Sequence, residues 1–107
     1  MNLCDNEEPS TDAVLRALSH EHRRIIFGYL AKQPEKDVDC GDVVEYLSLH
    51  EPSDADFETL EIQCHHVHFP KLDESGVIKH DVDGNTIHIE HRMMMEKITN
   101  LIKELEK

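Results

Sequence analysis

Apolar residues recur at the spacing of an amphipathic helix in five segments of the chain. These segments cover residues 11–18, 20–33, 41–50, 55–75 and 92–107. Ser10 or Thr11 can cap the first helix and Ser19 the second, because a hydroxyl oxygen accepts from an unpaired N–H of the first turn. Pro34 ends the second helix. Residues 37–40 predict a very short strand.

The same periodicity predicts which side of each helix faces the core. The expected inward faces of the first three helices are Ala13, Val14, Ala17 and Leu18; Ile25, Ile26, Tyr29 and Leu30; and Val43, Val44 and Leu47.

The fourth segment, residues 55–75, contains a proline within its helical pattern. Pro70 removes one backbone donor and clashes one turn back, so we expect a kink or two abutting helical pieces. Placing the run at 100° per residue gives an inward and an outward face. The inward face is Ile62, His65, Phe69 and Leu72. The outward face is Gln63, Val67 and Lys71, with His66 and His68 beside it.

The pattern changes to alternation after Gly76, which is well placed to end a helix. Val82, Ile87 and Ile89 alternate with polar residues on either side of the turn residues 83–85, and Asp-Gly is a strong hairpin signal. A helix followed directly by a β-hairpin is typical of a winged helix. We therefore predict a mainly α fold with a small β-hairpin wing, a winged helix-turn-helix.

The last helix carries a narrow apolar stripe at intervals of four, three and four residues. Its members are Met94, Ile98, Leu101 and Leu105. This is the spacing of a short coiled-coil seam, and the flanking residues are charged. The helix can fold back on its own domain, but the narrow stripe favours a homodimer interface.

Two stretches of the chain resemble ArsR-type winged-helix regulators. ALSHEHRRIIFGYL is similar to their opening helix, and HFPKLDESGVIKHDVDGNTIHI is similar to the segment that ends their recognition helix and forms their wing. With the acidic composition, the chain resembles a small haloarchaeal member. The resemblance covers residues 12–105. With the acidic N-terminus and the seam of the last helix, we expect a disordered lead-in at 1–10, a winged helix-turn-helix domain at 11–91 and a dimerisation helix at 92–107.

The charge of the chain changes this picture. It has 23 Asp and Glu against 11 Lys and Arg among 107 residues, for a net charge of −12. The acids are scattered, which favours adaptation of the whole surface to very high salt over mimicry of nucleic acid. The length suits one domain. No apolar run approaches the ~20 residues that span a bilayer, and the N-terminus lacks a signal-peptide layout, so we expect a cytoplasmic protein without a membrane partner.

These observations predict a transcriptional regulator, a local repressor or autoregulator, that binds double-stranded DNA as a homodimer. The expected DNA-binding residues of the fourth helix are Gln63, His66, His68 and Lys71, and those of the wing are Lys79, Asn85 and Thr86. They offer hydrogen bonds but little fixed charge. Arg23 and Arg24 can touch phosphate or pair with local acids. We expect no cofactor, and no effector follows from the sequence.

Two alternatives remain open. A winged helix can also serve as a protein-interaction module without DNA binding, which suits the acidic chain and an exposed Val67. A metal- or redox-responsive sensor is the second, since Cys64 and His68 form an i, i+4 pair of possible metal ligands. The ArsR cysteine pair at CxC spacing is missing. Neither a phosphate loop nor a nucleophile motif occurs, so we do not expect an enzyme.

Overall fold

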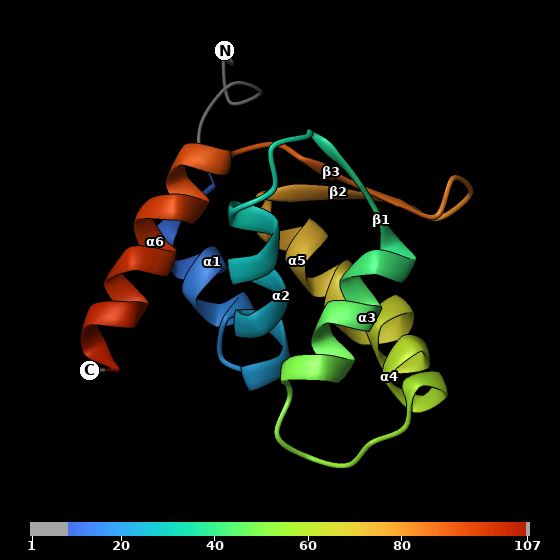
Figure 1. The fold of residues 1–107 in the computed structure, drawn as a ribbon. Helices are drawn as coiled ribbons and strands as arrows, with labels where there is room; N and C mark the ends of the chain where they lie inside the picture. The colour runs from blue at the N-terminus through green and yellow to red at the C-terminus, as the bar shows by residue number, and fades with distance from the viewer. Residues whose placement is uncertain (1–8, 107) are drawn as a thin grey trace.

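A computed structural model describes residues 9–106 of the chain. The elements follow in the order α1 (Thr11–Ala17), α2 (Glu21–Ala31), β1 (Asp37–Asp39), α3 (Cys40–His50), α4 (Phe57–Gln63), a π-helical turn (Cys64–His68), α5 (Phe69–Ser75), β2 (Ile78–Asp81), β3 (Thr86–Ile89) and α6 (Arg92–Leu105). The helices form a packed group, and the strands lie across one end of it (Figure 1). The lead-in expected at residues 1–10 lies, up to residue 8, outside the described residues.

Side-chain caps set the starts of the first helices. The hydroxyl of Ser10 accepts from the N–H of Ala13 at 3.0 Å, as the sequence predicted. The start of α2 differs from the prediction, because its cap is His20 and not Ser19. The Nδ1 atom of His20 accepts from the N–H of His22 at 3.0 Å. This shift places two histidine rings side by side at the beginning of α2, with centroids 4.8 Å apart.

The inward face of α2 is rotated from the predicted one. Arg23, Ile26, Phe27, Leu30 and Ala31 are its buried residues. The predicted Ile25 and Tyr29 are only partly buried. Burying 26, 27, 30 and 31 forms an equally regular stripe, so periodicity alone did not separate the two choices. For α3, the predicted inward residues Val43, Val44 and Leu47 are all buried.

The three strands form one antiparallel sheet in the order β1-β3-β2. The expected hairpin is therefore present, and its second strand is also paired with β1, where Val38 faces Ile87. Gly76 ends α5 in the left-handed region with a φ of 94°. The turn of the hairpin places its positive φ, 55°, at Asn85. Ile87 and Ile89 are buried, whereas Val82 is exposed.

The predicted break near Pro70 is a π-helical turn, in which the N–H of Phe69 donates to the carbonyl of Cys64, five residues earlier. Pro70 follows as an early residue of α5, where its missing N–H costs nothing. A wider turn also relieves the clash of the proline ring with the preceding turn. We call residues 57–75 the composite helix. The buried side chains along it are Leu60, Cys64, His68, Phe69, Leu72 and Ser75.

The inserted turn makes part of the predicted face wrong. Phe69 and Leu72 are buried as predicted, but Ile62 is 56% exposed and its place in the core is taken by Leu60 and Cys64. His65 is half-buried. One extra residue in the turn rotates everything before it by about 100° relative to the residues after it. The predicted inward face is therefore correct for the residues after His68 and is rotated away from the observed face for the residues before it.

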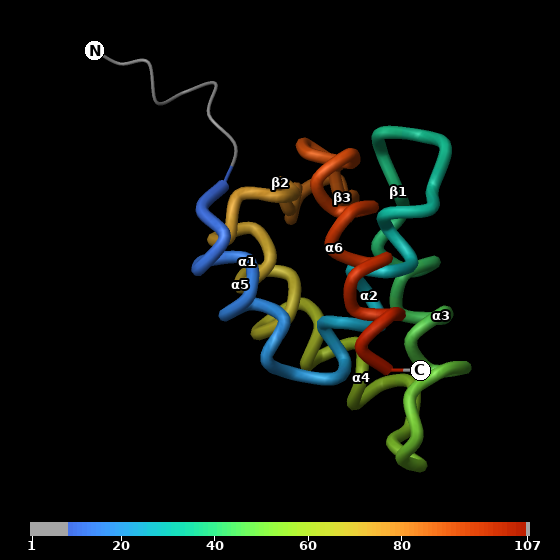
Figure 2. Tube along the Cα trace, turned by 90° about the vertical axis from the view of Figure 1, so that its left-hand side faces the viewer, coloured from blue at the N-terminus to red at the C-terminus, as the bar shows by residue number. Residues whose placement is uncertain are grey.

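The last helix, α6, packs against α2 (Figure 2). Met95 and Thr99 are its buried residues, and Met94, Ile98 and Ile102 are partly buried against the same core. Leu101 and Leu105 remain exposed at 64% and 84%. The predicted seam is thus split between residues that contact the domain and residues that face solvent. Over residues 9–106, no helix combines the length and apolar character needed to cross a membrane.

Candidate functional site

The outer surface of the composite helix and hairpin carries most of the predicted DNA-binding residues. Gln63, His66 and Lys71 are exposed on the composite helix. Lys79 and Asn85 are exposed on the hairpin, and Thr86 is half-buried. The hydroxyl of Thr86 donates to the carbonyl of Gly84 at 2.8 Å, which leaves its oxygen free to accept. Six of the seven predicted positions are therefore accessible.

The seventh, His68, is buried, and its predicted outward orientation is wrong. Its side chain is 3% exposed, and Arg23 donates from Nη1 to its Nδ1 atom at 3.1 Å. Arg23 also donates from Nε to the carbonyl of Ala17 at 2.5 Å. Arg23 is itself buried, so a contact with phosphate is excluded in this conformation. Arg24 is half-buried and donates to the carbonyl of Leu18 at 2.8 Å.

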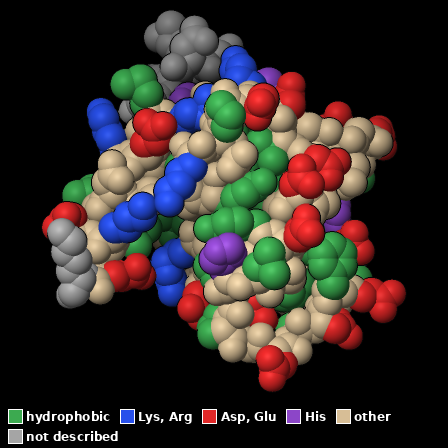
Figure 3. Space-filling model, in the orientation of Figure 1, with side chains coloured by type: hydrophobic (Ala, Val, Ile, Leu, Met, Phe, Trp, Pro, Cys, Tyr) green, Lys and Arg blue, Asp and Glu red, His purple; other side chains and the backbone are tan. Residues whose placement is uncertain are grey.

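The electrostatic character of this surface is acidic. Glu58 and Glu61 are exposed at the start of the composite helix and Asp54 just before it, and the nearest lysine on the same helix is Lys71. In Figure 3, Asp and Glu side chains gather on the side of α3, α4 and the hairpin, while Lys and Arg gather toward α6. A ligand on the composite helix therefore meets hydrogen-bonding groups and few positive charges.

Three apolar side chains are exposed on the same surface. Phe57, Ile62 and Val67 are 44%, 56% and 41% exposed, and all three belong to the first two pieces of the composite helix. They are interspersed with acidic residues and with Gln63 and His66. The surface can thus offer methyl and aromatic contacts beside hydrogen bonds, which suits either thymine methyl groups or an apolar protein surface.

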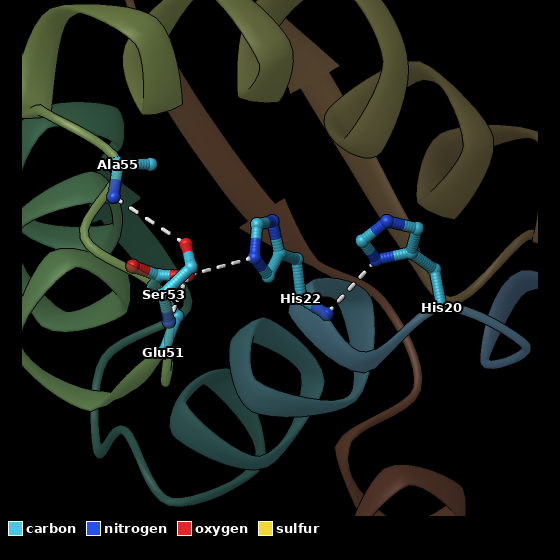
Figure 4. A network of polar contacts seen from close by, with 5 residues as sticks. All are labelled: His20, His22, Glu51, Ser53 and Ala55. Atoms are coloured by element: carbon cyan, nitrogen blue, oxygen red, sulfur yellow. Dashed lines mark hydrogen bonds and ion pairs between the residues drawn. The ribbon is translucent and has the colours of Figure 1, made fainter.

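A histidine cluster lies between α2 and the π turn. The side chains of His20, His22 and His68 have possible ligand atoms within 4.8 Å of one another. Glu51 is buried and accepts from Nε2 of His22 at 3.2 Å and from the hydroxyl of Ser53 at 2.6 Å (Figure 4). The hydrogen bond from Ser53 is the first cause that holds the pKa of Glu51 below its usual range. By accepting from Nε2, Glu51 orients the ring of His22.

The hydrogen bonds of this cluster oppose metal binding. His20 accepts at Nδ1 from the N–H of His22, and His68 accepts at Nδ1 from Arg23, so each neutral ring carries its proton on Nε2. Those two nitrogens therefore offer hydrogens and not lone pairs. The fixed charge of Arg23 also repels a cation. Burial, followed by the neighbouring His20 and Arg23, lowers the pKa of His68 to about 4, so it is neutral at pH 7.

A second group of possible ligands lies on the other side of the composite helix. Cys40, His65 and His80 come from α3, the π turn and β2, and their ligand atoms lie within 4.8 Å of one another. The predicted pair of Cys64 and His68 is not brought together in either group that the described residues form. Cys64 is buried, and burial raises the pKa of its thiol to about 12. A thiol in this state is unreactive, which argues against redox sensing by Cys64.

Sequence reasoning missed Arg23, Cys40 and His80 as members of these clusters. Each reaches its partners across long sequence separations, as in the 45 residues between Arg23 and His68. The one signal in the sequence was chemical, since cysteine and histidine are frequent possible metal ligands. Spacing along one helix favoured Cys64 with His68, and only the packing of three elements reveals Cys40 with His80.

The fold and these surfaces define a small, mainly helical domain with a three-stranded antiparallel sheet. The chain belongs to the family described as "Domain of unknown function (DUF7344)", which matches residues 15–88. The match begins within α1, ends within β3 and includes both histidine groups but not α6. No curated protein and no solved structure gave a significant match to the chain.

Proposed function

We propose that this protein is a DNA-binding transcriptional regulator of the winged helix-turn-helix type, acting as a homodimer. One observation carries the proposal. The composite helix runs directly into the hairpin of β2 and β3, and β3 is held at the centre of the sheet by β1. This order of helix, short strand, two helices and hairpin is compatible with a winged helix and supports the proposal. The composite helix then enters the major groove, and the hairpin lies on the adjacent backbone.

The acidic surface sets the mode of binding. Lys71 and Lys79 are the exposed lysines among the predicted contacts, so a dimer presents four such charges. Each phosphate neutralised contributes about −0.9 to the slope of log affinity against log salt, so the slope is about −3.6 or shallower. In molar salt the Debye length falls to about 3 Å, and short hydrogen bonds from Gln63 and His66 then contribute more of the affinity.

The dimer joins two such surfaces through α6. Leu101 and Leu105 form an exposed apolar pair on this helix, next to the half-buried Ile98. An antiparallel or parallel contact between two α6 helices would bury them and relate the two composite helices by a two-fold axis. Such an axis matches a palindromic operator with half-sites one helical turn of DNA apart.

The direct test is binding of the full chain to DNA from its own upstream region, measured by fluorescence anisotropy in 1–3 M KCl. We expect tighter binding to this DNA than to unrelated DNA of equal length. Lys71→Ala should weaken DNA binding. Lys97→Ala removes the same charge at an exposed position of α6 and should leave DNA binding unchanged. Equal affinity for the two DNAs, or equal effects of the two variants, would exclude the regulator.

One observation favours a second function, a protein-interaction module. Phe57, Ile62 and Val67 expose apolar area on an acidic surface that is poorly suited to a polyanion. A partner would present apolar side chains among lysines or arginines. If the chain binds no DNA, a partner retained by the wild type and lost by Ile62→Ser with Val67→Ser would support this function. Leu49→Ser, which removes an even more exposed leucine, at 74%, from α3, is the control.

A further inference from the structure

Three residues distant in the sequence meet beside the hairpin. Cys40 is the first residue of α3, directly after β1; His65 lies in the π turn; and His80 lies in β2. The Sγ atom of Cys40 and one ring nitrogen of each histidine lie within 4.8 Å of one another. A sulfur and two imidazole nitrogens form a donor set that zinc and similar divalent metals prefer.

The packing around these residues fixes the two rings. Phe69 contacts both, with ring centroids 5.2 Å from His65 and 5.1 Å from His80. The backbone of His80 is also held, because its N–H donates to a carboxylate oxygen of Asp73 at 2.8 Å. Side chains held by packing and by neighbouring hydrogen bonds lose little entropy when they bind a ligand.

His80 supplies an independent observation that favours a ligand. Its Nε2 atom is one of five buried side-chain atoms without a hydrogen-bond partner within residues 9–106; two others, Nδ1 of His22 and Nε2 of His68, belong to the cluster beside Arg23. A buried polar atom without a partner costs about 1–3 kcal/mol, so such atoms are rare in native proteins. The lone pair or proton of this nitrogen therefore needs a partner, and a metal ion shared with Cys40 would supply one.

Charge at this position favours a cation. The carboxylates of Asp39, directly before Cys40, and of Asp81, directly after His80, act on the position of the Cys40 sulfur. These two negative charges attract a divalent metal, and a bound metal stabilises the thiolate. In contrast to the cluster at His20, where Arg23 faces His68, no arginine or lysine hydrogen-bonds to Cys40, His65 or His80 among the described residues.

We propose that Cys40, His65 and His80 form a binding site for one Zn²⁺-like divalent metal ion. Binding exchanges the thiol proton of Cys40 for the metal, and that proton passes to solvent. Ligand atoms around tetrahedral zinc lie about 3.5 Å apart, so atoms now within 4.8 Å of one another close by at most about 1.3 Å on binding. The fourth position is open to water. The ion then joins the hairpin, the start of α3 and the π turn.

This proposal is independent of DNA binding, and its test uses the full chain without DNA. We expect Co²⁺, added to the reduced, metal-free protein, to give the near-ultraviolet band of a thiolate–cobalt bond and the visible bands of a tetrahedral site. The bands should saturate at one equivalent and disappear when Zn²⁺ is added. Cys40→Ser should abolish the near-ultraviolet band, and His80→Gln should weaken Co²⁺ binding by at least about tenfold.

Two variants serve as matched controls. Cys64→Ser changes another buried cysteine next to His65 and should keep the band, and His20→Gln changes the other histidine group and should keep the affinity. If His80→Gln does not fold by circular dichroism, the half-exposed His65→Gln replaces it. The proposal is overturned if wild type gives no thiolate band, if Cys40→Ser retains it, or if Cys64→Ser loses it.

Discussion

Arg23 and His68 form a buried polar contact that joins α2 to the end of the π turn. Arg23 brings a permanent charge into the domain, where it is partnered by the carbonyl of Ala17 and by Nδ1 of His68. His68 can accept this bond only when Nδ1 is unprotonated. The contact therefore requires neutral His68, and it links the stability of the fold to pH.

We predict that the free energy of unfolding falls as the pH is lowered from about 6.5 to about 4. In the folded chain the pKa of His68 is lowered to about 4, first by burial. In the unfolded chain, His68 takes up a proton near pH 6.5. Below that pH, protonation stabilises the unfolded chain but not the folded one, so the free energy of unfolding is full above about pH 6.5 and falls on acidification. The difference of roughly 2.5 pH units corresponds to about 3 kcal/mol. Urea unfolding at a series of pH values measures it.

The comparison is with His68→Gln, whose amide oxygen can accept from Arg23 but does not titrate. This variant should be less stable than wild type at pH 7 and should lose less stability between pH 6.5 and 4.5. The carboxylates are the same in the two proteins, so the difference between their pH profiles reports the titration of His68. Parallel pH profiles for the two proteins would show that His68 does not carry the effect.

At the scale of elements, local patterns predicted most helices and both hairpin strands. Gly76 and the turn at residues 83–85 ended and connected elements as expected, because their backbone requirements are local. The composite helix shows where local patterns fail. The N–H of Phe69 donates to the carbonyl of Cys64, five residues earlier, and this π turn shifts the inward face between α4 and α5. Only the tertiary core selects the wider turn.

The start of the composite helix depends on one capping side chain. A carboxylate oxygen of Asp56 accepts from the N–H of Thr59 at 2.8 Å, and hydrogen bonding by Thr59, first from its side chain and then from this N–H, lowers the pKa of Asp56. We predict that Asp56→Ala lowers the free energy of unfolding by about 1 kcal/mol, because it leaves that N–H without its cap. Asp54→Ala removes the same charge two residues away and should change it by less than about 0.5 kcal/mol. Equal urea midpoints for the two variants would contradict the cap.

The candidate metal site could not be predicted at either of these scales. His80 looks like an ordinary strand residue in the sequence, and Cys40 like a small residue beside a glycine. Antiparallel pairing of β1 with β3, and of β3 with β2, puts the beginning of α3 and β2 on either side of β3, and the side chains of Cys40 and His80 approach each other there. Such a site arises from topology and not from spacing, so it becomes visible only with the assembled domain.

For the whole molecule, the net charge of −12 means that folding brings like charges together. We predict that raising KCl from 0.1 to 2 M increases the free energy of unfolding by on the order of 1 kcal/mol, since screening shortens the range of this repulsion. Urea unfolding at each salt concentration is the measurement. A variant with Asp54→Asn, Glu58→Gln and Glu61→Gln has a net charge of −9 and should respond less. If KCl stabilises the wild type and this variant equally, the effect comes from salting-out of apolar surface and not from screening of the repulsion.

Association of the proposed dimer can be tested without disturbing the fold of the protomer, because the apolar side chains of α6 differ in burial. Leu101 and Leu105 face solvent, so changing them leaves the core of one protomer intact. Burying a leucine contributes about 1.5–3 kcal/mol, so Leu101→Glu with Leu105→Glu should weaken association at least about a hundredfold. Sedimentation equilibrium measures the change. Leu49→Glu, on α3, should leave it unchanged, and a monomeric wild type would overturn the dimer.

The central position of β3 has a consequence for how the chain folds as it is synthesised. β1 finds its partner in β3 about fifty residues later, and α2, which packs against α3, gains its contact with α6 only at the end of the chain. Contacts between distant residues form slowly, and the side of α2 that faces α6 stays uncovered until the last helix leaves the ribosome. Premature termination after β3 would therefore release a chain with that side of α2 exposed, a substrate for chaperones and proteases.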